Sequence, residues 1–217
     1  MHRERKFFRS VLIAVCFFLL ATLSNCIAIR GGIAALRSTS DFVPLQSDSR
    51  VLYEPGAEEF AAEVAVYLPD AIATVEKGLY RPFAKPVQVY VCATKESIAA
   101  HGGWGKVRAV TTTKLFLDAE LVKKVQDGNS AKMILTHELS HLHLSQRLGL
   151  FRTAKIPAWF DEGLAVMVSG GAPAVDVSES DAAKAIMSGK CIKPDVSGSL
   201  LFPKLLGLLW AEAAYVL

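Results

Sequence analysis

The sequence predicts a single α+β domain that follows an apolar N-terminal segment. Residues 86–94 alternate valines with other side chains, and residues 110–117 are rich in β-branched side chains, so each stretch is expected to form a strand. Residues 57–79 carry apolar side chains at helical spacing, and two more helices are expected, one ending near Gly149 and one opening on Pro157. Separate strands and helices of this kind favour the α+β class.

The composition is that of a globular protein with a basic leader. The chain has 217 residues, of which 52% are hydrophobic and 21% are charged, and this suits one domain with a real core plus a terminal segment. Of the net charge of +3, residues 1–30 contribute +4, so the remainder of the chain carries only −1. A nearly neutral body argues against a nucleic acid as the partner.

The N-terminal segment has the features of an export signal, because basic residues precede an uncharged run at residues 10–29. Three fates stay open. The chain is cleaved after Ala28, or it is lipid-linked at Cys26 in a stretch that resembles a lipoprotein cleavage box, or its 20 uncharged residues are kept as a membrane span. We favour an anchor over free secretion. The predicted division is a signal or anchor segment at 1–30, a linker at 31–52 and a domain at 53–217.

The motif His137-Glu138-Leu139-Ser140-His141 lies within the helix that is expected to end near Gly149. Two histidines four residues apart lie on one face of a helix, about one turn apart, so both imidazoles can reach one metal ion. The glutamate that follows the first histidine then lies beside the metal, where it can take a proton from a water molecule. The motif therefore indicates metal-dependent hydrolysis.

A second helix is expected to supply a third ligand. It opens on Pro157 and carries Glu162 in its second turn. The 20 residues between His141 and Glu162 are enough to end one helix, turn, and bring a second helix alongside. Two histidines and one glutamate from paired helices form the ligand set of a catalytic zinc site with an open fourth position.

These two motifs, HELSH and WFDEGLA, resemble the gluzincin branch of the zinc metallopeptidases, and within it the short bacterial peptidase-MA-like domains. The resemblance covers about residues 57–168. It implies a zincin-like fold in which His137, His141 and Glu162 bind one Zn²⁺ per chain. It also implies that Glu138 is the general base.

The chain departs from the thermolysin-like members of that family at Val166. Those members carry an acidic residue at this position, one helical turn after the third ligand, and it orients a ligand histidine. Another residue must take that role here. Asp161 is the candidate, but adjacent helical residues point about 100° apart, so Asp161 is equally well explained as a surface charge near a helix N-terminus.

The resemblance also assigns a role to the strand expected at residues 110–117. In gluzincin folds the strand before the zinc helix is the edge of the sheet, and an extended peptide pairs with it through backbone hydrogen bonds. An ordinary inner strand is the alternative. Residues 200–217 predict an apolar helix, and the C-terminal lobe is expected to be short for this family.

Four further residues needed an interpretation. His143 is expected on the far side of its helix from the metal, and His101, in a glycine-rich stretch, is expected in a solvated loop. Cys92 and Cys191 are expected either to form a disulfide in an oxidising compartment or to be two separate thiols, with Cys92 buried in a strand.

Together these features predict a membrane-anchored zinc metallopeptidase that acts on a peptide or protein outside the cytoplasm, in the bacterial periplasm or at the cell surface. Peptide bonds are hydrolysed by a water that zinc activates and Glu138 deprotonates. The alternative is a catalytically silent zincin-fold module for binding or assembly in the cell envelope. The lack of an acidic residue at Val166 and the short C-terminal lobe favour that alternative.

Overall fold

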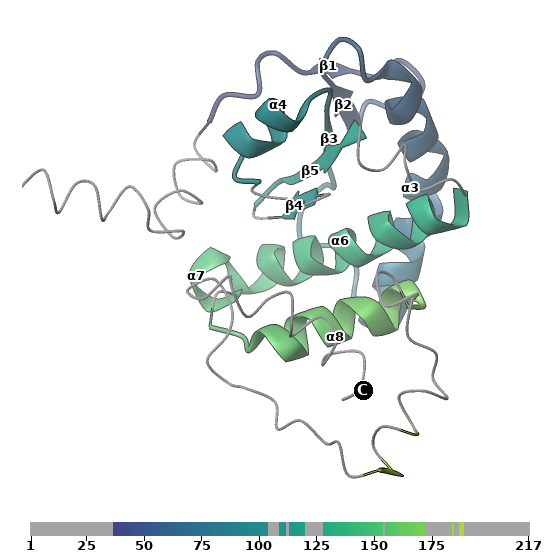
Figure 1. Cartoon of the computed structure of the whole chain (residues 1–217), viewed down its shortest axis with the longest axis vertical. Helices are drawn as coiled ribbons and strands as arrows, with labels where there is room; N and C mark the ends of the chain where they lie inside the picture. Colours follow the sequence, from purple (N-terminus) through teal and green to yellow (C-terminus); the bar gives the residue numbers. More distant parts are fainter. Residues whose placement is uncertain are drawn as a thin grey trace, which may run out of the picture.

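The computed structural model describes residues 37–103, 109–111, 113–119, 128–153 and 155–171, together with residues 184, 187 and 188. These residues form an α+β fold with one mixed five-stranded sheet, as expected from the sequence (Figure 1). The leader at 1–30 and the helix expected at 200–217 lie outside the described residues. In the described part of the chain, none of the helices has the length and apolar character needed to cross a bilayer.

The sheet has three parallel central strands and an antiparallel strand at each edge, in the order β1-β2-β3-β5-β4. The strands are β1 (Val43–Pro44), β2 (Val51–Tyr53), β3 (Val89–Cys92), β4 (Ala109–Thr111) and β5 (Leu115–Asp118). All the side chains of β3 and β5 are buried, which is typical of strands covered on both faces.

Alternation along β3 and β5 divides the core into two layers. Val89 and Leu117 belong to the larger cluster, which α3 (Glu58–Gly78) and α6 (Gly128–Leu148) complete on one face of the sheet. Tyr90 and Phe116 point to the other face and pack with Ile98 of the short helix α4 (Lys95–Ala100). The two faces are therefore covered by different helices, as Figure 1 shows.

The linker predicted at residues 31–52 is wrong over its second half. Both β1 and β2 fall in or across it, and Val51 and Phe42 are buried. Strands of two and three residues are too short to produce a recognisable alternation among the polar residues around them. The folded domain therefore begins no later than Phe42.

The single strand predicted at residues 110–117 is also wrong, because the chain turns back on itself within it. Strands β4 and β5 pair antiparallel with Thr111 opposite Leu115. Strand β5, which directly precedes the next helix among the described elements, is an inner strand, and β4 is the edge. Within the predicted stretch, only residues 109–111 therefore belong to an edge strand of the described sheet. A continuous run of β-forming residues concealed the turn.

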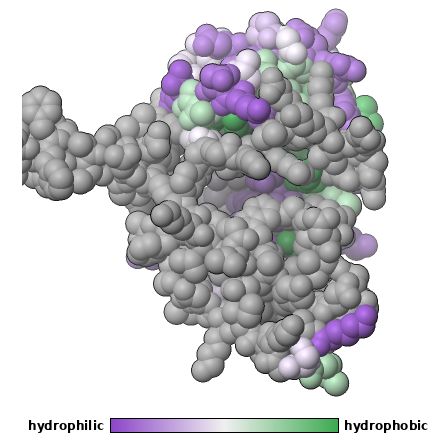
Figure 2. Space-filling model, in the orientation of Figure 1, coloured by the Kyte–Doolittle hydropathy of each residue, from purple (hydrophilic) through white to green (hydrophobic). Residues whose placement is uncertain are grey.

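The helix predicted at 57–79 is confirmed as α3, and it continues without a break through Pro69. Its buried side chains, which include Leu68 and Val75, hold it against the sheet and against α6, so the missing backbone hydrogen bond at the proline is tolerated. In the view of Figure 2, the coloured surface at the top of the molecule is mainly hydrophilic, with scattered apolar side chains.

Helix α6 lies between the sheet and α8 (Ala158–Ser169), and the single-turn helix α7 (Leu150–Thr153) connects α6 to α8 (Figure 1). Helix α6 ends, as predicted, at Gly149, whose φ of 77° is the left-handed conformation that glycine adopts at no steric cost. Helix α8 follows Pro157 and stops at Gly170 in the same way. Helices α6 and α8 are thus antiparallel neighbours joined by a short connection.

Candidate metal centre

The packing of α8 against α6 brings the three predicted ligands together. His137 Nε2 lies 3.2 Å from Nε2 of His141 and 3.2 Å from Oε2 of Glu162. His141 Nε2 lies 3.6 Å from the same carboxylate oxygen. Each residue thus offers one ligand atom to a common point, and among the described residues this is the group that can hold a metal ion.

The spacing of these atoms fits tetrahedral coordination. Metal bonds of 2.0–2.1 Å at tetrahedral angles place neighbouring ligand atoms about 3.3 to 3.4 Å apart. The three observed separations of 3.2, 3.2 and 3.6 Å fall on either side of that value. Three ligands of this kind leave a fourth position for a water molecule or a substrate. The donor set therefore fits a small divalent transition metal.

The burial of the cluster also calls for a cation. The side chains of His137, His141 and Glu162 are only 3%, 13% and 15% exposed. Oε2 of Glu162 is buried and accepts no well-aligned hydrogen bond from the described residues; the two imidazoles are its near neighbours. Burial of a carboxylate beside two imidazoles is costly unless a proton or a metal ion offsets its charge, and a metal ion at this point would do so.

The electrostatics of the metal-free cluster point the same way. Burial disfavours the charged form of His141, but the carboxylates of Glu162 and Asp161 outweigh burial and hold the pKa of His141 well above its usual value. Burial likewise disfavours the charged form of Glu162, and the two imidazoles outweigh it, so the pKa of that carboxyl lies well below its usual value. Without metal, a proton on His141 balances the negative charge.

Asp161 lies at the second nitrogen of a ligand histidine. Its Oδ1 is 3.1 Å from Nδ1 of His141, and its side chain is 22% exposed. This position agrees with the first of the two interpretations of Asp161, and not with a charge directed into solvent. An aspartate at Nδ1 keeps the proton on that nitrogen, which leaves the lone pair of Nε2 directed at the metal point.

Glu138 lies beside the cluster and is tied to the edge of the sheet. Its Oε2 accepts a hydrogen bond of 2.8 Å from the hydroxyl of Thr111, the last residue of β4. Local sequence does not indicate this contact, because Thr111 is one of three adjacent threonines and the stretch reads as a single strand without a turn. Only the fold shows which threonine meets α6.

The other two histidines of the described region have structural contacts. His143 packs on Phe83, and its Nε2 lies 3.0 Å from the carbonyl oxygen of Arg81, away from the group formed by His137, His141 and Glu162. Its burial lowers its pKa. His101 was expected in solvent, and this is wrong. His101 is 5% exposed, and its ring stacks on that of Phe116 with 4.4 Å between the ring centroids, because α4 folds it onto the sheet.

Cys92 is a free thiol in the middle of the fold. It is buried at the end of β3, and this burial raises its pKa to about 12. A protonated, buried thiol is chemically inert. The structure therefore agrees with the interpretation of Cys92 as a buried strand thiol; Cys191 lies outside the described residues.

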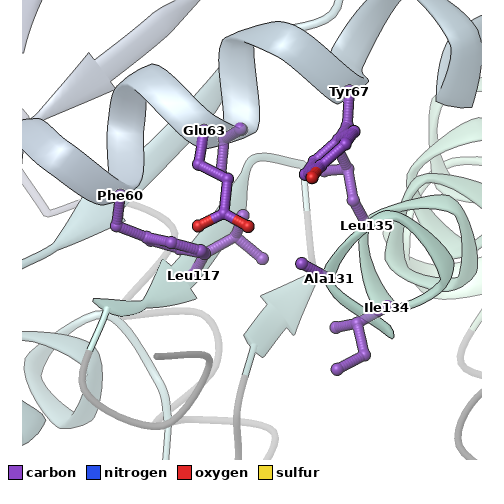
Figure 3. Close-up of a pocket in the computed structure, with 8 residues that line it drawn as sticks. Phe60, Glu63, Tyr67, Leu117, Ala131, Ile134 and Leu135 are labelled. Carbon is purple, nitrogen blue, oxygen red and sulfur yellow. The ribbon is translucent and has the colours of Figure 1, made fainter. Parts of the chain in front are cut away.

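A small pocket between α3, β5 and the first half of α6 shares no residue with the metal cluster (Figure 3). Phe60, Leu117 and Leu135 form part of its apolar lining, and the carboxylate of Glu63 points into it. Its lining includes neither histidine nor cysteine. The chemistry of this pocket is that of a gap in core packing, and the metal centre remains the candidate site.

Replacement of Asp161 by asparagine is expected to weaken zinc binding by about 10- to 100-fold, since it removes the negative charge that supports the His141 ligand. Competition with a chromophoric chelator measures the affinity. Asp70→Asn is the matched control, because Asp70 of α3 is 74% exposed, pairs with Lys132 near the start of α6 and does not belong to the metal cluster. An Asp161→Asn affinity equal to that of the wild type contradicts the assigned contact.

Metal binding at pH 7 is expected to release about one proton per zinc ion. The raised pKa keeps His141 protonated in the metal-free protein, whereas the lowered pKa leaves Glu162 already ionised, and a ligand imidazole must be neutral. Affinity therefore falls as the pH is lowered. Calorimetric titration in buffers of different ionisation enthalpy measures the proton count, and a count near zero contradicts this charge arrangement.

Comparison with known proteins adds no relative to this picture. The chain matches no protein-family model, and no curated protein or solved structure is similar to it. The resemblance to gluzincins consequently rests on its two motifs and stays a hypothesis.

Proposed function

We propose that the chain is a zinc metallopeptidase of the gluzincin type with a zincin-like fold. One observation carries the proposal: the donor atoms of His137, His141 and Glu162 converge at tetrahedral spacing, with Glu138 next to the first of them on the same helix. A purely structural metal site needs no glutamate beside its first ligand. A hydrolytic site needs one.

Zinc is the metal that this donor set suits best. Two imidazole nitrogens and one carboxylate oxygen, with a fourth position open, are the ligands of hydrolytic zinc sites. Zinc bound there supplies a Lewis acid, which polarises a scissile carbonyl and makes a water molecule acidic near neutral pH. His137 and His141 hold the metal from α6, and Glu162 holds it from α8.

Glu138 has the role of proton carrier. It accepts a proton from the attacking water and then donates that proton to the amine that leaves. It does not belong to the ligand group. Its contact with Thr111 shows that the carboxylate is directed towards the sheet edge, which is where a substrate has access to strand pairing.

The substrate is an extended peptide or protein segment that adds to the outer side of β4. Strand β4 is the last strand on one side of the described sheet, so its outer backbone groups face no strand among the described residues. Pairing through backbone groups accepts many side chains and places a peptide alongside the base. Strand β5 pairs with β3 on one side and with β4 on the other, so we assign this part to the short strand β4 and not to the longer β5.

The basic and apolar leader supports a location outside the cytoplasm. Residues 10–29 carry no charge and follow a cluster of arginines and lysine, which is the arrangement of an anchor with its basic end in the cytoplasm. We therefore place the enzyme on the outer side of the membrane, held by a retained or lipid-linked leader. An inactive envelope module is less favoured, because Asp161 places beside His141 the negative charge that is absent at Val166.

The variant Glu138→Gln tests the proposal. It is expected to keep about one zinc ion per chain and to lose peptide hydrolysis by roughly 10²- to 10⁴-fold, because the amide cannot take the proton. A peptide library followed by mass spectrometry measures turnover. Glu96→Gln, at an exposed position on α4, is the control and should cleave like the wild type. Equal cleavage by Glu138→Gln and wild type refutes the role, and no cleavage by either favours the inactive module.

A further inference from the structure

Glu138 is held from outside its own helix, and this contact carries a further inference. The carboxylate belongs to α6, and the hydrogen bond that it accepts comes from the Thr111 hydroxyl of β4, 27 residues earlier in the chain. The bond is 2.8 Å long and partly buried. A hydroxyl that donates to a carboxylate at this distance makes a charge-assisted hydrogen bond, which is stronger than a neutral one.

The physical effect of this bond is to select one orientation of a flexible side chain. Glutamate has three rotatable side-chain bonds, and an unrestrained carboxylate is distributed over several rotamers. The Thr111 hydroxyl engages Oε2 of Glu138. A base must lie within hydrogen-bond reach of the proton that it takes, so fixing this carboxylate before the reaction raises the fraction of chains that are ready to react.

The position of Thr111 in the sheet adds a second effect. Thr111 pairs with Leu115 on the inner side of β4, and β4 is the last strand of the described sheet on that side. A peptide that adds to the outer side of β4 is therefore in contact with the strand that holds the base. The edge that recognises the substrate and the carboxylate that moves the proton are linked through one side chain.

We propose that Thr111 is a positioning residue that holds the carboxylate of Glu138 from the edge strand β4, to which an extended peptide would add. This inference rests on the proposed peptidase function and adds a positioning residue to that site. It assigns to Thr111 no contact with the metal or with the reacting atoms. The consequence is a defect in turnover, and not in metal binding, when the hydroxyl is lost.

The test compares Thr111→Val, which keeps the shape of the side chain without the hydroxyl, with Thr111→Ser, which keeps the hydroxyl. On a peptide that the wild type cleaves, Thr111→Val is expected to lower kcat by about 10- to 100-fold with KM and zinc content unchanged. Thr111→Ser is expected to retain most of kcat. The control is Thr74→Val, because the Thr74 hydroxyl bonds only to the backbone of its own exposed helix turn.

A double-mutant cycle gives a readout that needs no substrate. Denaturant unfolding of wild type, Thr111→Val, Glu138→Ala and the double variant is expected to show clear non-additivity, because Glu138→Ala removes the acceptor that a glutamine would keep. In the presence of one substitution, the other shifts the unfolding midpoint less than it does alone. Additive shifts overturn the proposed contact. Turnover by Thr111→Val equal to that of the wild type overturns the positioning role.

The failure of this inference differs from the failure of the proposed function. If the wild type cleaves peptides and Glu138→Gln does not, the peptidase assignment stands, and an active Thr111→Val then removes the positioning role alone. If the wild type and Glu138→Gln are equally inactive, the peptidase function fails, and the positioning role fails with it. A loss of zinc in Thr111→Val also overturns the inference, because it indicates a general disturbance of the site.

Discussion

The contact between α6 and α8 is the constraint on which the site depends. Two of the proposed ligands come from one helix and are placed by its 3.6-residue period, but the third can join them only if the second helix lies alongside in the right register. Leu139 and Leu142 fix one side of α6 in the core, and Val168 of α8 packs into the same cluster. The apolar packing thus sets the position of Glu162 within 3.2 to 3.6 Å of the imidazoles.

That packing brings together ionisable side chains whose removal from water costs free energy. The cluster combines two histidines with Glu162 and Asp161 in a place where the histidines and Glu162 are largely buried. Such groups are tolerated in an interior when they neutralise one another or hold a metal ion. In the metal-free chain, a proton on His141 offsets negative charge in this cluster. A divalent ion held by the same cluster would offset that charge instead. The sheet completes the arrangement, because its edge strand reaches Glu138.

The sequence predicts those features that depend on a long regular pattern. The helix at 57–79, the face shared by His137 and His141, and the stop at Gly149 follow from helical period and glycine chemistry. Very short strands leave no pattern, so β1, β2 and the turn before β5 escaped recognition. The contacts of Thr111 and of His101 depend on how helices are laid on the sheet, which local spacing does not encode. The structure also separates the two interpretations of Asp161 through a distance between helices.

The zinc content of the purified chain, measured by elemental analysis beside that of Glu162→Ala, tests the proposed metal centre most directly. We expect about one zinc ion per chain in the wild type, and a large loss of zinc in a variant that still folds by circular dichroism. Such a result establishes that a carboxylate of α8 completes a site begun by α6. A folded wild-type chain that takes up no zinc, or a Glu162→Ala variant that binds it equally well, contradicts the central claim.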